Sequence, residues 1–281
     1  VNKQGAIYAK LERLDNGKGI LVLKDTDGDG RAETKTSFGN YIGTGIAIKG
    51  NYLYAASNKE VFKYALNDNG DVVDENAAAT IVTGLVDKGQ HNSKSITLDN
   101  AGNIYVNVGA PSNSCQEKDR TKGSMGMMPC PILDSAGGIW QFKVDQLNQT
   151  YATGVRYATG LRNVVGLDWN NQLNQLFVTQ HGRDMLNNLF PDLYDTTVSA
   201  ELPSETMYAI KKGDNAGWPY IYYDHVKGKK MMAPEYGGDG VKTVDDKYIN
   251  PAMAFPAHMA PNGLLFYTGN QFPDRYKNGA F

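Results

Sequence analysis

Hydrophobic and polar residues alternate along this chain in short runs that turn residues interrupt. Gly5–Glu12 and Gly19–Lys24 have the pattern of two strands of one small sheet, and Gly43–Ala55 contains two apolar runs around a Gly50-Asn51 turn. Val61–Leu66 extends this group. No stretch carries the 3.6-residue period of a long amphipathic helix. The pattern therefore predicts antiparallel strands joined by tight turns.

The same unit recurs further along the chain: an apolar run, a turn, a second apolar run and a later third run. Its copies are found at Ser95–Gly109 with Gly138–Val144, at Val165–Val178 with Met207–Lys211, and from Asn262–Tyr267 onward. Internal repetition of such a unit is the sequence signature of propeller blades. We therefore expect an all-β protein, a β-propeller of four-stranded antiparallel blades.

Four clear units and a partial one at the start can be counted, and the last copy is interrupted at Asn278–Phe281. We expect residues 1–281 to form a single β-propeller domain that lacks its last blade or blades. The connections between the strands grow longer along the chain. Long loops on a rigid scaffold are where binding and catalytic residues usually lie, so we expect the functional residues there.

Composition and charge exclude some classes of partner. The chain has 281 residues, of which 41% are hydrophobic and 21% charged, with a formal net charge of -2. This charge offers no general attraction to nucleic acid or to an anionic membrane surface. No run approaches the roughly 20 apolar residues that a membrane helix needs, so we expect no membrane insertion. The chain starts at Val1 without the pattern of an export signal, so any such signal has been removed or was never part of this sequence.

Two cysteines, Cys115 and Cys130, enclose a polar loop that contains glycine and methionine, Gln116–Pro129. In an oxidising compartment a disulfide between them would stabilise the fold by about 3 kcal/mol in the chain-entropy model. Two free thiols in a reducing compartment are the alternative. We favour the disulfide, and with it an exported protein, because no other metal-ligand residues stand near the pair.

Several short motifs place polar side chains at the ends of apolar runs. They are Gly160-Leu-Arg-Asn163, Gly182-Arg-Asp184, Asp214-Asn-Ala-Gly-Trp-Pro219, His91 ahead of Ser95–Val106, and His258-Met-Ala-Pro261. Taken together, these motifs make the chain resemble, over nearly its whole length, the soluble sugar dehydrogenases that use pyrroloquinoline quinone (PQQ), of the glucose/sorbosone type. Within that family it looks most similar to the L-sorbosone dehydrogenases.

The resemblance implies a six-bladed propeller with PQQ and Ca²⁺ as cofactors. It implies an oxidoreductase that oxidises an aldose or sugar aldehyde by hydride transfer to the quinone. Electrons would leave to an acceptor such as a cytochrome, and the protein would be periplasmic or secreted. In the family, the lysine and arginines that neutralise the cofactor's carboxylates lie at positions that would follow Phe281.

By resemblance, His91 is the general base that takes the proton of the substrate hydroxyl. An imidazole suits this role because its ordinary pKa lies near the operating pH. Arg162 and Asn163 would bind the quinone side, where a cation and an amide stabilise the negative charge that develops there. The alternatives are a structural loop histidine and an arginine in a salt bridge between blades.

The resemblance also implies that Gly182 and Arg183 bind Ca²⁺ through their backbone carbonyls, since calcium prefers oxygen ligands. Arg183 departs from the proline of the glucose-oxidising branch and matches the Arg-Asp pair of the sorbosone-type branch. Asp184 would orient this loop or be a solvated turn residue. His258 would contact the cofactor or line the substrate pocket, with a packed core histidine as the alternative.

A separate acidic segment, Asp25–Glu33, has carboxylates at Asp25, Asp27 and Asp29 followed by a glycine, as in the first half of an EF-hand loop. Thr36 stands where a closing glutamate should be. A second Ca²⁺ site and a structural turn are therefore both open.

Two other functions remain compatible with the same scaffold. A non-catalytic propeller would be a binding module that has lost the cofactor. A propeller lactonase or sugar hydrolase would keep calcium and need no quinone. Fold alone does not decide among them.

Overall fold

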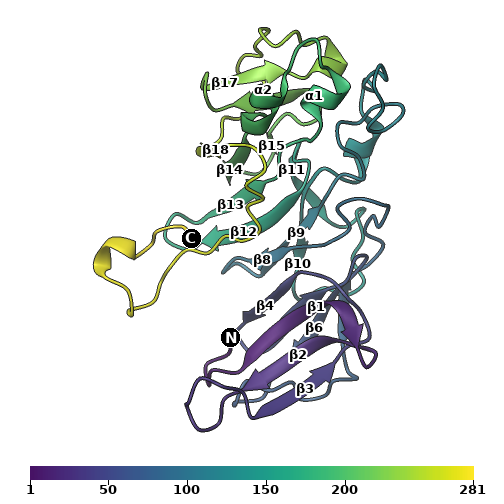
Figure 1. Ribbon diagram of the computed structural model, residues 1–281. Helices are drawn as coiled ribbons and strands as arrows, with labels where there is room; N and C mark the ends of the chain where they lie inside the picture. The colour runs from purple at the N-terminus through teal and green to yellow at the C-terminus, as the bar shows by residue number, and fades with distance from the viewer.

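The computed structural model describes all 281 residues and consists of β-strands with only short helices (Figure 1). The α-helices are α1 (Leu186–Leu189) and α2 (Thr196–Glu201), and the 3-10 turns are η1 (Pro131–Asp134), η2 (Pro234–Tyr236) and η3 (Asp274–Tyr276). The longest helix has 6 residues, and none qualifies as a membrane span.

Four antiparallel sheets follow one another in chain order and form the blades of a β-propeller (Figure 1). The first sheet is β1 (Ile7–Asp15), β2 (Lys18–Lys24) and β3 (Thr34–Phe38). The second is β4 (Ile46–Lys49), β5 (Tyr52–Ala56), β6 (Val61–Ala65) and β7 (Ala79–Val82). The expected all-β propeller is therefore confirmed, with three strands in the first blade.

The two later blades carry the long connections. The third is β8 (Ile96–Leu98), β9 (Asn103–Val108), β10 (Gly138–Lys143) and β11 (Val155–Thr159), to which β15 (Asp214–Asn215) adds in parallel. The fourth is β12 (Val164–Asn170), β13 (Gln175–Gln180), β14 (Glu205–Ile210) and β18 (Met253–Phe255). A separate hairpin, β16 (Ile221–Asp224) and β17 (Lys229–Met232), lies between β14 and β18 in sequence.

The unit expected from Asn262 onward does not form a blade. Its residues make one isolated antiparallel bridge, between Phe266 and Ala280. A strand is stable only with hydrogen-bonded neighbours, and this short run has a single bridge. In Figure 1 the segment extends away from the sheets, in yellow.

The hydrophobic core lies between successive sheets. One cluster joins the first blade to the second, another joins the second to the third, and a third cluster joins the third to the fourth. In the last of these, the rings of Tyr105 and Trp169 stack with their centroids 5.1 Å apart. Such aromatic pairs add roughly 0.5–1.5 kcal/mol beyond the area they bury. The blades therefore form a stiff support for the loops at their ends.

The strand directions gather the long loops at one end of the blades. β8 and β9 are antiparallel, so the loop that enters β8 and the loop that leaves β9 lie at the same end. The same holds for the loops around β12 and β13. These loops contain the polar motifs that the sequence singles out.

The expected disulfide between Cys115 and Cys130 is present, in the connection between β9 and β10. Both cysteines are buried in a small cluster with Ala110 and Trp218. The loop that they close is thereby attached both covalently and by packing to the third blade.

Candidate active site

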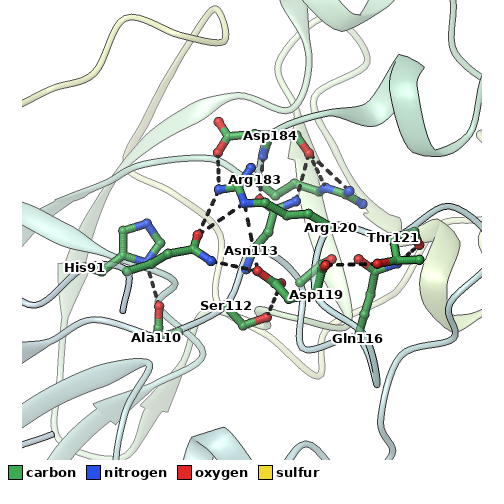
Figure 2. A network of polar contacts seen from close by, with 12 residues as sticks. His91, Ala110, Ser112, Asn113, Gln116, Asp119, Arg120, Thr121, Arg183 and Asp184 are labelled. Atoms are coloured by element: carbon green, nitrogen blue, oxygen red, sulfur yellow. Dashed lines mark hydrogen bonds and ion pairs between the residues drawn. The ribbon is translucent and has the colours of Figure 1, made fainter. Parts of the chain in front are cut away.

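His91 lies just ahead of β8, with a backbone φ of 56° and a half-buried side chain. Its Nδ1 atom is 2.6 Å from the carbonyl oxygen of Ala110 (Figure 2). Because a carbonyl oxygen can only accept, Nδ1 carries the proton and Nε2 keeps its lone pair. Burial, with the positive charge of Arg162 acting in the same direction, lowers the pKa of His91 to about 4. The ring is therefore neutral at pH 7, with Nε2 able to accept a proton.

Gly109, at the end of β9, brings His91 and Asn163 close together. A Cβ atom at this position would lie 2.6 Å from the His91 Cβ and 2.7 Å from the Asn163 Oδ1. Only glycine leaves room for both neighbours. The Oδ1 of Asn163 accepts a hydrogen bond from Asn107, while its Nδ2 has no acceptor within the protein.

Arg162 is almost fully buried, with 3% of its surface exposed. Its Nη1 donates to the carbonyl of Gly182 at 2.8 Å, and its Nη2 donates to Asp184 at 2.9 Å. Its Nε and Nη2 also donate to the carbonyl and side-chain oxygens of Asn113 at 3.2 and 3.1 Å. Four of its five N–H groups are thus used, which leaves one on Nη1.

Asp184 joins two arginines from different loops. Its Oδ2 atom accepts from Arg162 and from Arg120, each at 2.9 Å. Burial alone would raise the pKa of Asp184, but these two guanidinium groups hold it below its usual value. Asp184 is therefore a carboxylate that balances charge beside His91, with 41% of its side chain exposed.

The disulfide loop supplies further members of this network (Figure 2). Arg120 donates to the side-chain oxygen of Gln90 at 2.9 Å, and Gln90 donates to Asp119 at 2.7 Å. Asp119 also accepts from Ser112 at 2.7 Å and from the backbone of Asn113 at 2.9 Å. The loop is thereby connected to the residue that precedes His91.

The side chain of Arg183 donates to the backbone carbonyl of Asp184 at 3.2 Å and reaches Glu235. Arg183 and Glu235 form an ion pair at 2.6 Å, with 4% and 0% of their side chains exposed. Glu235 also accepts from Ser114 at 2.9 Å. Because the Arg183 side chain is engaged there, only its backbone is available for a ligand.

A second buried carboxylate, Glu205, connects the loop of Gly182 to the loop of His258. It accepts from the backbone N–H groups of Gly182 at 3.0 Å and of His258 at 3.2 Å. Burial raises the pKa of Glu205. The Nε2 of His258 donates to the carbonyl of Ser199 at 3.0 Å, although most of the side chain is exposed.

A small cavity of about 20 Å³ is lined in part by Arg162. Its lining includes His181, whose Nε2 is buried without a partner, and Trp218. This volume holds roughly one water molecule and no sugar.

The acidic segment between β2 and β3 brings four carboxylates together. One oxygen from each of Asp25, Asp27, Asp29 and Glu33 lies within 4.8 Å of the others, and all four residues are exposed. Asp25 also accepts from the N–H groups of Gly28 at 2.7 Å and Gly30 at 2.8 Å. Glu33, and not a residue at position 36, is thus the fourth acidic member.

Sequence reasoning predicted some members of the site and missed others. The structure brings His91, Arg162, Asn163, Gly182 and Asp184 together, as their motifs suggested. It adds residues that no motif marked: Gln90, Asn113, Asp119, Arg120, Glu205 and Glu235. The disulfide was the one signal that the loop around Arg120 is ordered.

A family model described as TrAA12-like matches residues 10–277 of the chain. A "Pyrroloquinoline quinone-dependent sugar dehydrogenase" of Hypocrea jecorina (strain QM6a) is 23% identical over 279 residues, which cover 91% of this chain and 63% of that protein. The chain spans less than two thirds of the length of the curated relatives that it matches.

Two solved structures share the fold. A calcium structure of a Trichoderma reesei carbohydrate-active enzyme of family AA12 has a TM-score of 0.70 at 17% identity, over 95% of this chain and 75% of that one. The holo form of the PQQ domain of pyranose dehydrogenase from Coprinopsis cinerea has a TM-score of 0.69 at 18% identity, over 90% and 64%.

The buried pair of Arg183 and Glu235 gives a test of the loop's structure. Arg183→Met leaves the Glu235 carboxylate buried without its cation, so we expect the free energy of unfolding to fall by about 3–5 kcal/mol. Denaturant titration measures this change. The double variant Arg183→Met/Glu235→Leu should recover most of the loss, because no charge then remains buried. Equal losses in the two variants would show that the ion pair is not the cause.

Proposed function

We propose that this chain, which belongs to the TrAA12-like family, is an oxidoreductase that oxidises an aldose or a sugar aldehyde with PQQ as the hydride acceptor. One observation carries the proposal. The unprotonated Nε2 of His91 has no partner within the protein, and Gly109 brings the side-chain amide of Asn163, whose Nδ2 donates to no protein group, close to His91. A proton acceptor next to hydrogen-bond donors is what the oxidation of a hydroxyl group needs.

The residues of the chain divide the work as follows. His91 accepts the proton of the substrate hydroxyl at Nε2, while its Nδ1–H stays bonded to Ala110 and fixes the ring. Arg162 and Asn163 bind the quinone side through the Nη1 and Nδ2 groups that the protein leaves unused. Asp184 keeps the charge of Arg162 in place. When bound, PQQ supplies an electrophilic carbonyl that accepts a hydride equivalent.

The residues present fit a quinone in their donor chemistry, because Arg162 and Asn163 each keep an N–H group that no protein acceptor uses. We also propose Ca²⁺ as a cofactor, held by the loop of Gly182. The carbonyl of Gly182 has one lone pair left after it accepts from Arg162, and the backbone of Arg183 follows it. The positive charge of Arg162 opposes a second cation here, and Asp184 together with the carboxylates of the cofactor would offset it. His258 would contact the cofactor from the neighbouring loop.

Sugars are the substrate class that we propose, and a cytochrome or another external acceptor would take the electrons. The buried disulfide supports an oxidising compartment, so we propose that the protein is periplasmic or secreted. The relative that is named a PQQ-dependent sugar dehydrogenase supports the proposal that the substrate is a sugar.

Reconstitution tests the reaction. With PQQ and Ca²⁺ added, the protein should reduce a redox dye in the presence of one or more aldoses or sugar aldehydes. His91→Gln should lower kcat by about 10²–10⁴-fold, the usual contribution of a general base. His225→Gln, a matched histidine change that leaves the network of His91 untouched, should retain activity. Absence of PQQ binding would contradict the proposal and favour a binding module or a hydrolase.

The pH dependence of turnover follows from the lowered pKa of His91. The base acts only when neutral, and its pKa in the folded protein is about 4. We therefore expect kcat/KM to stay high as the pH falls through 6.5 and to decline only as it approaches about 4. Steady-state kinetics over this range, with a check that the protein remains folded, measures it. An acidic limb near 6.5 would show that the pKa of the catalytic histidine is not lowered.

The cluster of Asp25, Asp27 and Asp29 is proposed as a second calcium site, with Glu33 as a fourth carboxylate. Calorimetric titration of the PQQ-free protein with Ca²⁺ should show a binding event that Asp27→Asn/Asp29→Asn removes, because two anionic ligands are lost. Asp68→Asn, an exposed carboxylate elsewhere on the surface, is the control. If the wild type, Asp27→Asn/Asp29→Asn and Asp68→Asn give the same titration curve, the cluster binds no Ca²⁺ and is a structural turn.

A further inference from the structure

The loop closed by the disulfide places Arg120 between two parts of the candidate active site. Its Nη2 lies 2.9 Å from the Gln90 side-chain oxygen and 2.9 Å from Asp184 Oδ2, and its Nε lies 3.3 Å from the same Gln90 oxygen. A planar guanidinium is suited to such a forked contact because its donors have a fixed geometry. The side chain of Arg120 thus connects the loop of His91 to the loop of Asp184, which in turn binds Arg162 (Figure 2).

Gln90 is held at both ends of its amide. Its oxygen accepts from Arg120, and its nitrogen donates to Asp119 at 2.7 Å. His91 follows Gln90 directly in the chain. Its backbone φ is 56°, a value that residues with a Cβ atom seldom adopt. Such a conformation persists only where the surroundings fix it. Among these surroundings, the contacts of Gln90 fix the residue directly before His91.

At its other end, Arg120 shares Asp184 with Arg162. The direction of the Arg162 guanidinium depends on where this carboxylate lies, because Asp184 is its anionic acceptor. Arg120 therefore acts on both the proton acceptor and the group proposed to bind the quinone. It touches neither of them directly.

The covalent closure of the loop explains how Arg120 stays in place. Cys115 packs on Ala110, whose carbonyl holds the His91 ring, and on Trp218. Arg120 itself is only partly buried, with 31% of its side chain exposed, so little packing fixes it. Its position relies on the ring of residues that the disulfide closes.

We propose that Arg120 is a positioning residue that sets the mutual orientation of His91 and Arg162, and that the Cys115–Cys130 disulfide holds it in that position. The expected effect of Arg120 on turnover rests on the proposed function. The orientation of His91 and Arg162 depends only on residues of this chain, so one readout of the experiment needs no cofactor.

The first readout is the titration of the His91 ring by NMR, assigned by the signal that His91→Gln removes among four histidines. Arg162, Asp184 and Arg120 are the charged groups that act on this ring. In Arg120→Ala the pKa of His91 should rise from about 4 toward 6.5, since a positive charge is lost and the loop opens to water. Arg120→Lys keeps the charge without the fork and should give a smaller rise. Lys122→Ala, in the same loop and exposed, should change nothing.

The second readout is turnover in the reconstituted protein. Arg120→Ala should lower kcat by about 10–100-fold with little change in KM, as expected when reacting groups are misplaced by about 1 Å. Arg120→Lys should recover part of this loss. If the disulfide acts through Arg120, the effects of Arg120→Ala and Cys115→Ser/Cys130→Ser should not add when combined.

An unchanged His91 titration in Arg120→Ala would overturn the proposal. Full additivity with the cysteine variant would overturn the role given to the disulfide. If the wild type shows no turnover with PQQ, the proposed function fails, and the titration still decides whether Arg120 positions His91. Thermal unfolding of each variant confirms that the comparison is made on folded protein.

Discussion

The desolvation of Arg162 is the constraint on which the rest of the site depends. A guanidinium with 3% of its surface exposed has lost almost all contact with water, and only well-placed acceptors compensate for that loss. The acceptors come from two separate stretches of the chain, one that contains Asn113 and one that contains Gly182 and Asp184. The loops around β9, β12 and β13 therefore have to converge. Their convergence is what makes a site at this end of the propeller.

The same burial determines the chemistry of His91. In water an imidazole is partly charged near neutrality, whereas here low exposure and the nearby Arg162 both favour its neutral form. Asp184 and the Ala110 carbonyl act in the opposite direction and do not reverse this result. The carbonyl also decides which nitrogen keeps the proton. One buried cation and one backbone oxygen thus give a proton acceptor of defined tautomer.

The sequence predicts the scaffold better than it predicts the site. Alternating apolar runs and Gly-Asn turns are local signals, and the strands that they mark, such as β4 and β5, form as expected. The unit from Asn262 shows the limit of such signals, because pairing depends on a neighbouring strand and not on the run alone. His91, Arg162 and Asn163 stood in recognisable motifs next to strands. Arg120 and Glu235 did not, since their partners are 64 and 52 residues away in sequence.

Loops of this length are costly to order, at roughly 1–2 kcal/mol of backbone entropy per residue. The blades are stabilised by the apolar clusters between them, but the loop from Cys115 to Cys130 contributes few buried apolar side chains of its own. Its order comes from the disulfide, from the contact of Tyr236 with Ser114, and from the ion pairs of Arg120. These hydrogen bonds, ion pairs and the disulfide act over short distances and fix the orientation of the side chains that they join. A site built this way gains exact placement of His91 and Arg162, and in return its geometry depends on an oxidising compartment that keeps the disulfide closed.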